Sequence, residues 1–226
     1  MPENKHLIFI NYRGSDEIWA TELVYARMTE AFGADAVFKA GNALAPGDVY
    51  SPILREKAAL CPIMLVCIGA SWASSRDADG NRRLDSPDDW VRREITLSLR
   101  AGNRVVPVLF GNHGEVSVPK AADLPADLSS LINRQAWRLA PGGGLDMTMP
   151  MLIDKLIELE PELGRRRAEL GSDRGGSPAA ETRPPHDEIA STDTASTLFS
   201  KNRFKFKGDF VNGTKVVNNG PDGTRT

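Results

Sequence analysis

Three short runs of almost continuous apolar residues limit what this chain can fold into. They lie at residues 7–11, 63–68 and 104–110. Runs of this length and pattern predict β-strands that are buried on both faces. Helical patterns and two weaker strand patterns lie around them, the helices at about 16–32, 48–60, 86–99 and 149–159 and the strands at 36–38 and 135–139. Because strands alternate with helices, we expect a parallel sheet with right-handed crossovers.

Five such strands predict an α/β fold, a three-layer sandwich with the flavodoxin-like strand order 2-1-3-4-5. In that order a ligand crevice opens at the carboxyl ends of strands one and three. Those ends are residues 11–16 and 69–72, and helix 86–99 follows the loop after strand three. Three segments that are distant in the sequence are therefore expected to meet at one crevice. Pro107, within the fourth strand, predicts a local break in strand pairing.

Composition narrows the classes of protein. The 28 basic and 30 acidic residues give a formal net charge of −2, which favours neither nucleic acid nor a membrane surface as a partner. No apolar run approaches the length of a membrane span. Cys61 and Cys67 form no CxxC pair, and the three histidines lack ligand spacing. We therefore expect reduced, buried cysteines, no metal site and a cytoplasmic location.

The helix predicted at residues 86–99 has clear start signals. Ser86 can cap it, and Pro87 suits the first helical position, where its missing N–H costs nothing. Val91, Ile95 and Leu99 recur at every fourth position and predict a core-facing stripe.

Trp90 and Glu94 share a second face of this helix, beside the apolar stripe. Positions 97 and 98 hold Leu and Ser, so Glu94 has no basic partner one turn later. A solvated glutamate and a core-packed tryptophan are the ordinary explanations of such a pair. The functional explanation is a pocket wall that carries a carboxylate.

Several motifs, taken in order, resemble TIR (Toll/interleukin-1 receptor/resistance) domains over roughly residues 5–160. The run Asp89-Trp90-Val91-x-x-Glu94-Ile95 is similar to the catalytic-glutamate segment of the NAD-cleaving members. Residues 9–16 resemble box 1, residues 37–48 resemble box 2 with its BB loop, and residues 63–72 resemble the central strand and its following turn. Box 3 is poorly matched: Trp137 stands where it is expected, and no role is assigned there.

The resemblance implies a prokaryotic NAD⁺ glycohydrolase that self-association activates, with Glu94 as the catalytic residue. NAD⁺ is then the substrate, and no cofactor is required. The resemblance also implies substrate-binding roles for the residues around the crevice, namely Tyr12, Arg13, Ser15, Asp16, Lys39, Trp72 and Trp90. Core packing of the tryptophans and a surface salt bridge for Arg13 or Lys39 remain alternatives. The chain has no GxGxxG, so Rossmann-type redox binding of NAD is not expected.

Two other functions fit the same topology. One is a non-catalytic TIR scaffold that signals by homotypic TIR–TIR assembly, with Glu94 incidental. The other is a receiver domain, which needs a phospho-accepting Asp at the end of strand three. Cys67-Ile68-Gly69 offers no such residue, so the receiver is disfavoured.

The chain changes character after the predicted domain. Residues 161–198 are rich in Gly, Pro, Ser and Thr and predict a disordered linker, in which the arginines at 165–167 are expected to be a solvated helix end rather than a nucleic-acid contact.

Residues 199–222 form a β-prone tail that weakly resembles prion-like amyloid signalling motifs, which implies a receptor partner with a matching motif that binds through residues 204–219 (Phe204 to Asn219). A disordered basic tail is the alternative, because residues 201–220 carry five positive charges and one negative.

Overall fold

The computed structural model describes residues 6–40, 50–140 and 144–175. The chain divides into two compact units, residues 1–178 and 179–226. The second unit lies outside the described residues. So do the β-prone tail at 199–222, most of the expected linker and most of residues 37–48, which resemble box 2 with its BB loop.

The first unit contains a five-stranded, all-parallel sheet in the order β2-β1-β3-β4-β5. This confirms the predicted α/β fold class and its strand order. The strands are β1 (Ile8–Asn11), β2 (Val37–Lys39), β3 (Ile63–Ile68), β4 (Arg104–Phe110) and β5 (Trp137–Leu139). The three apolar runs form β1, β3 and β4, the three adjacent strands at the centre of the sheet.

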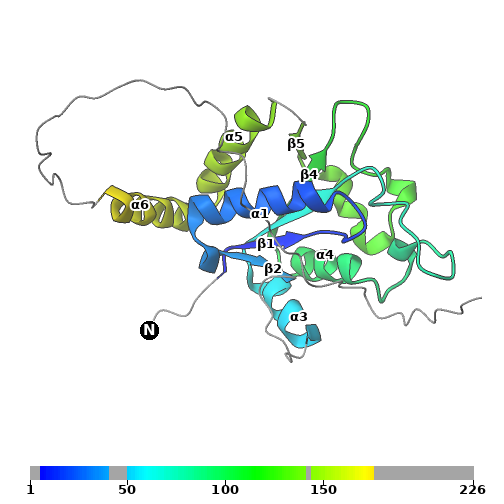
Figure 1. Cartoon of the computed structure of the whole chain (residues 1–226). Helices are drawn as coiled ribbons and strands as arrows, with labels where there is room; N and C mark the ends of the chain where they lie inside the picture. The colour runs from blue at the N-terminus through cyan, green and yellow to red at the C-terminus, as the bar shows by residue number, and fades with distance from the viewer. Residues whose placement is uncertain (1–5, 41–49, 141–143, 176–226) are drawn as a thin grey trace, which may run out of the picture. The chain divides into compact units, whose positions relative to one another are not determined.

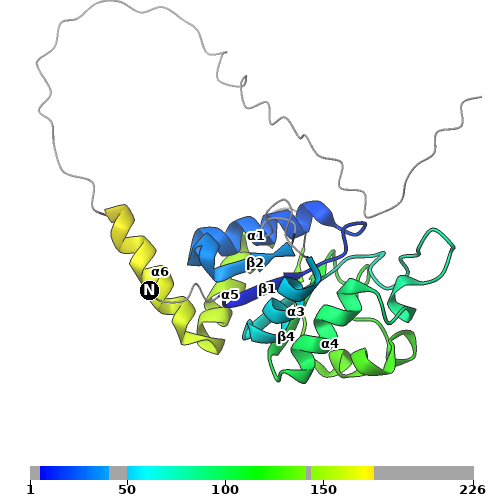
Figure 2. The same ribbon diagram turned by 90° about the horizontal axis from the view of Figure 1, so that it is seen from below.

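Both faces of the sheet are buried because alternate strand residues enter separate hydrophobic cores. In β3, for example, Leu65 belongs to one core and Val66 to the other. Helices α1 (Ile18–Phe32), α5 (Gly144–Leu159) and α6 (Pro161–Gly175) supply the first core. Helices α3 (Tyr50–Leu60) and α4 (Trp90–Arg100) supply the second. Figures 1 and 2 show α1 on one side of the strands and α3 and α4 on the other.

Pro107 does not interrupt the pairing of β4 with β3. The register runs from Ile63 opposite Arg104 to Ile68 opposite Leu109 and includes Val66 opposite Pro107. Pairing with β5 begins one residue later, at Val108. The predicted break is therefore wrong for the β3 side, and the proline lies just before the start of the β5 pairing.

The expected cap of helix α4 is also wrong, and helix α1 has no side-chain cap. Helix α4 begins at Trp90, and its N-cap is Asp89, whose Oδ1 accepts a hydrogen bond from the Arg92 amide 3.0 Å away. Ser86 instead accepts a bond from the Asp88 amide in the turn before the helix. Helix α1 begins at Ile18, and its N-cap Glu17 has a left-handed backbone (φ 47°) and makes no side-chain cap bond.

Residues 161–175 form helix α6, which corrects the predicted start of the disordered linker. The helix packs against α1 and α5, and Leu163 is fully buried between them. Two of its arginines pair with acidic residues on neighbouring elements: Arg166 with Asp35 and Arg167 with Asp154. Tertiary contacts of this kind stabilise a segment whose composition alone does not favour a helix.

Smaller differences concern other boundaries. Helix α5 begins at Gly144, earlier than the predicted 149, and contains Pro150. Short 3₁₀ segments, Ala121–Asp123 and Ala126–Asn133, lie between β4 and β5. Within the described ranges, none of the helices has the length and apolar character that a bilayer crossing requires. Cys61 and Cys67 are buried and form no disulfide.

Candidate functional site

Glu94 projects from the first turns of α4 toward the carboxyl end of β1, and 7% of its surface is exposed. Its Oε2 accepts a hydrogen bond of 2.6 Å from Asn11 Nδ2, and the described residues donate no hydrogen bond to its Oε1. Burial raises the pKa of the carboxyl group from 4.5 to about 8, the Asn11 hydrogen bond lowers it, and the nearby charge of Asp89 raises it further. At neutral pH Glu94 in this state is mainly protonated. A cation beside the carboxyl group would favour its ionised form through charge attraction.

Asn11 is the site residue that the sequence reasoning missed. It is the last residue of β1 and has no exposed surface. Side chains alternate along a strand, so Asn11 shares a face with Phe9, whose core is the one that α4 covers. This alternation could have predicted the contact, because it places the amide of Asn11 on the face of the sheet that α4 covers.

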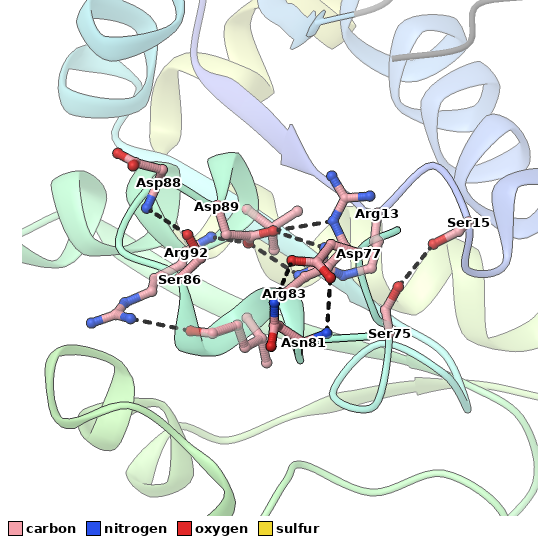
Figure 3. A network of polar contacts seen from close by, with 12 residues as sticks. Arg13, Ser15, Ser75, Asp77, Asn81, Arg83, Ser86, Asp88, Asp89 and Arg92 are labelled. Atoms are coloured by element: carbon pink, nitrogen blue, oxygen red, sulfur yellow. Dashed lines mark hydrogen bonds and ion pairs between the residues drawn. The ribbon is translucent and has the colours of Figure 1, made fainter. Parts of the chain in front are cut away.

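Arg13 and Asp89 form a buried bidentate ion pair below the start of α4 (Figure 3). Arg13 Nη1 lies 2.9 Å from Asp89 Oδ2, and Nη2 lies 3.1 Å from Oδ1. The two side chains are 4% and 3% exposed. Arg83 adds a longer contact to the same carboxylate at 3.6 Å. Arg13 is therefore neither in a surface salt bridge nor free to bind a phosphate in this conformation.

Asp16 joins the loop after β1 to the end of β3. Its Oδ2 accepts a bond of 2.7 Å from the Gly69 amide, and its Oδ1 accepts bonds from the amide and hydroxyl of Ser71 at 2.9 and 2.7 Å. A Cβ at position 69 would lie 2.2 Å from Glu17 Cγ and 2.7 Å from Asp16 Oδ1, so this junction requires glycine. Asp16 thus shapes the crevice, with both carboxylate oxygens already bound within the protein.

Lys39 ends β2 with its side chain 2% exposed. Its Nζ lies 2.6 Å from Glu22 Oε1 and 5.1 and 5.3 Å from the ring centroids of Tyr12 and Tyr25. The charge of Lys39 is balanced by one carboxylate and two aromatic rings. Tyr12 is consequently part of the packing around Lys39.

The two tryptophans differ. Trp72 has no exposed surface and belongs to the core on the α4 side of the sheet, which favours its packing role. Trp90 is partly buried, and the Arg93 guanidinium lies 5.6 Å from its ring centroid. Trp90 is therefore the tryptophan that can still present part of a wall to a ligand.

Ser15 is exposed, and its hydroxyl lies 3.1 Å from that of Ser75, as Figure 3 shows. The sequence-predicted residues thus come from the ends of β1, β2 and β3 and from the start of α4, as expected for one sheet edge. Four residues at this edge interact directly: Asn11 is hydrogen-bonded to Glu94, Arg13 is paired with Asp89, and the charge of Asp89 acts on Glu94.

Glu94 does not line either of two hollows that lie among the described residues. One, of about 340 Å³, lies beyond the end of β3 and is lined by Gly69, Ser74, Arg76 and Arg82 among others. The other, of about 460 Å³, lies between α1, α5 and α6, away from this edge. Within the described part of the chain, no cluster of three or more His, Cys, Asp or Glu side chains is arranged to hold a metal.

A scan against models of protein families gives no match to this chain, and a search of curated proteins gives no significant relative.

Proposed function

We propose that this chain is a TIR-type NAD⁺ glycohydrolase in which Glu94 is the catalytic residue. The observation that carries the proposal is the environment of that carboxyl group. It is buried at the carboxyl edge of a parallel sheet, one of its oxygens is held by Asn11, and among the described residues no basic group acts on it. Carboxyl groups with strongly perturbed pKa values occur preferentially at functional sites.

A single carboxylate is enough for this reaction. The bond between the ribose C1 and the nicotinamide nitrogen breaks, the electron pair stays with that nitrogen, and nicotinamide leaves as a neutral base. A ribosyl cation with oxocarbenium character remains, as in glycoside hydrolysis. Water adds to C1 and loses a proton to give ADP-ribose, or a group within the molecule adds to give a cyclic product. Glu94 stabilises the cation or holds the ribose hydroxyls.

The raised pKa of Glu94 fits a site that is switched on by its substrate. Nicotinamide in NAD⁺ carries a positive charge, and a positive charge beside a buried carboxyl group favours its ionised form. Binding of NAD⁺ is therefore coupled to release of a proton from Glu94. In the free protein the neutral form avoids an unpaired buried charge.

The other residues at this edge have three kinds of role in the proposal. Arg13, Asp16 and Trp72 form the frame, because each is already engaged within the protein. Trp90 and Ser15 are exposed enough to contact the substrate directly. Tyr12 and Lys39 form the wall on the β2 side.

The second candidate is a TIR scaffold without catalysis. The internal partners of Arg13, Asp16 and Lys39 favour it, since three of the residues expected to bind substrate already have structural roles. A scaffold would still assemble through TIR–TIR contacts, so assembly does not distinguish the two candidates. Chemical change of NAD⁺ does.

The proposal includes self-association as the activating step, and a cytoplasmic immune or cell-death role. The tail recruits the domain to a receptor with a matching amyloid motif through residues 204–219, and clustering then raises activity. The residues around Glu94 require neither nucleic acid nor a membrane for this chemistry.

Nicotinamide release by the purified full chain tests the function. The assay should cover dilute to concentrated protein, with and without a crowding agent. We expect nicotinamide to appear and the rate per molecule to rise with protein concentration. The absence of nicotinamide at every concentration would favour the scaffold.

A further inference from the structure

We propose that Asn11 is a positioning residue for Glu94: it holds Oε2 and leaves Oε1 and its own Oδ1 for the ribose hydroxyls of the substrate. This inference rests on the proposed function. It extends that function to Asn11 and to the effect of Asn11 on the charge of Glu94.

The amide nitrogen of Asn11 is bound at two points of α4. Nδ2 donates to Glu94 Oε2 at 2.6 Å and to the backbone carbonyl of Val91 at 3.3 Å. An amide nitrogen carries two hydrogens, and each has an acceptor here. The bond to a backbone carbonyl sets which way the amide faces, so it fixes the NH₂ group on Glu94.

The amide oxygen of Asn11 is buried and has no hydrogen-bond partner among the described residues. Buried polar atoms are nearly always paired, and an unpaired acceptor of this kind is destabilising. A ribose presents neighbouring hydroxyl groups that donate hydrogen bonds. The unpaired Oδ1 and the second oxygen of Glu94 are two acceptors on adjacent side chains for such a pair of donors.

The same hydrogen bond controls the charge of Glu94. Burial and the charge of Asp89 oppose ionisation, and among the described residues the bond from Asn11 is the influence that favours it. Asp89 is itself paired with Arg13. A second acid, Asp127, lies on the 3₁₀ segment that packs against α4 and is hydrogen-bonded by Arg92 and Thr96. Removing the Asn11 amide should therefore make Glu94 harder to ionise.

Two variants of Asn11 test the inference. Asn11→Leu keeps a similar volume and removes the donor, and Asn11→Asp keeps the shape while replacing the donor with a second acid. A hydrogen bond to a charged group corresponds to about a 10- to 100-fold effect, so we expect nicotinamide release at neutral pH to fall by about that factor in Asn11→Leu. The acid limb of the pH–rate profile should move up by about 1 to 2 pH units, with activity recovering in alkali. Asn11→Asp should move it further.

A carboxyl NMR titration of Glu94 gives a readout that does not need turnover. We expect its pKa to rise in both variants, and an unchanged pKa in a folded variant would overturn the inference. A loss of activity that is uniform across pH would also overturn it, because that pattern belongs to a merely structural residue. If the wild type releases no nicotinamide, the proposed function fails, and the titration still decides whether Asn11 controls the ionisation of Glu94.

Discussion

Arg13 and Asp89 join the end of β1 to the start of α4 through two hydrogen bonds within one buried ion pair. Asp89 is also the N-cap of α4, so a single carboxylate both starts the helix and binds the guanidinium. Because Glu94 lies on the next turn of α4, this ion pair determines where the candidate catalytic carboxyl group stands relative to β1.

Breaking this pair should destabilise the protein strongly. Arg13→Met leaves the buried Asp89 carboxylate with Arg83, 3.6 Å away, as its remaining basic partner among the described residues. The loss of one partner from a buried pair costs up to about 3–5 kcal/mol. Denaturant unfolding measures the effect. Arg93→Met is the matched control, since Arg93 pairs with the exposed Asp88, and it should change the free energy of unfolding by less than about 1 kcal/mol. Equal effects in the two variants would contradict the structural role of Arg13.

A methyl group at position 69 should disrupt the junction between β1 and β3. Gly69→Ala places a Cβ against Glu17 and Asp16, and overpacking of this kind costs about 1–3 kcal/mol. Gly14→Ala is the matched control, because a Cβ there meets nothing within 4 Å. Thermal unfolding of the two variants gives the comparison, and a Gly69→Ala protein as stable as the wild type would show that the junction can rearrange.

The stability of the protein should depend on pH through Glu94. Its folded pKa of about 8 lies above the ordinary value of 4.5, so the folded state keeps a proton that the unfolded state releases. The stabilisation is complete below pH 4.5, declines as the pH rises and is lost above about 8. Glu94→Gln has no such decline, so its stability relative to the wild type should increase over this range, by an amount on the order of 5 kcal/mol. A difference that is constant from pH 4 to 9 would refute the raised pKa; denaturant unfolding across pH measures it.

Much of the fold could be predicted because short apolar runs in the sequence indicate the strands, and the alternation of strands with helices indicates their order in the sheet. The apolar runs at 7–11, 63–68 and 104–110 became the three central strands, and the parallel order then brought the ends of β1 and β3 together. Helix α6 could not be predicted in this way. Its segment gains stability from tertiary burial of Leu163 and from the pairing of Arg166 with Asp35, which lies 131 positions away.

The sheet edge at which the candidate residues lie could be predicted from the sequence, whereas their partners within the protein could not. The carboxyl edge followed from the strand order, and helical spacing placed Glu94 beside the apolar stripe of α4. Its catalytic role was implied only by the resemblance to TIR domains. The partner of Arg13 did not, because nothing local in the sequence links positions 13 and 89, and Ser86-Pro87 is as good a local cap signal as Asp89. The bond from Arg13 adds a tertiary contact to Asp89 that Ser86 lacks, and the helix begins after Asp89.

The requirement for Glu94 in nicotinamide release is the central claim. Wild type, Glu94→Gln and the control Glu158→Gln, an exposed carboxylate on α5, should be compared at one high protein concentration by following nicotinamide and NAD⁺ in the same sample. We expect release by the wild type and by Glu158→Gln, and none by a folded Glu94→Gln. Release by Glu94→Gln at the wild-type rate would contradict it.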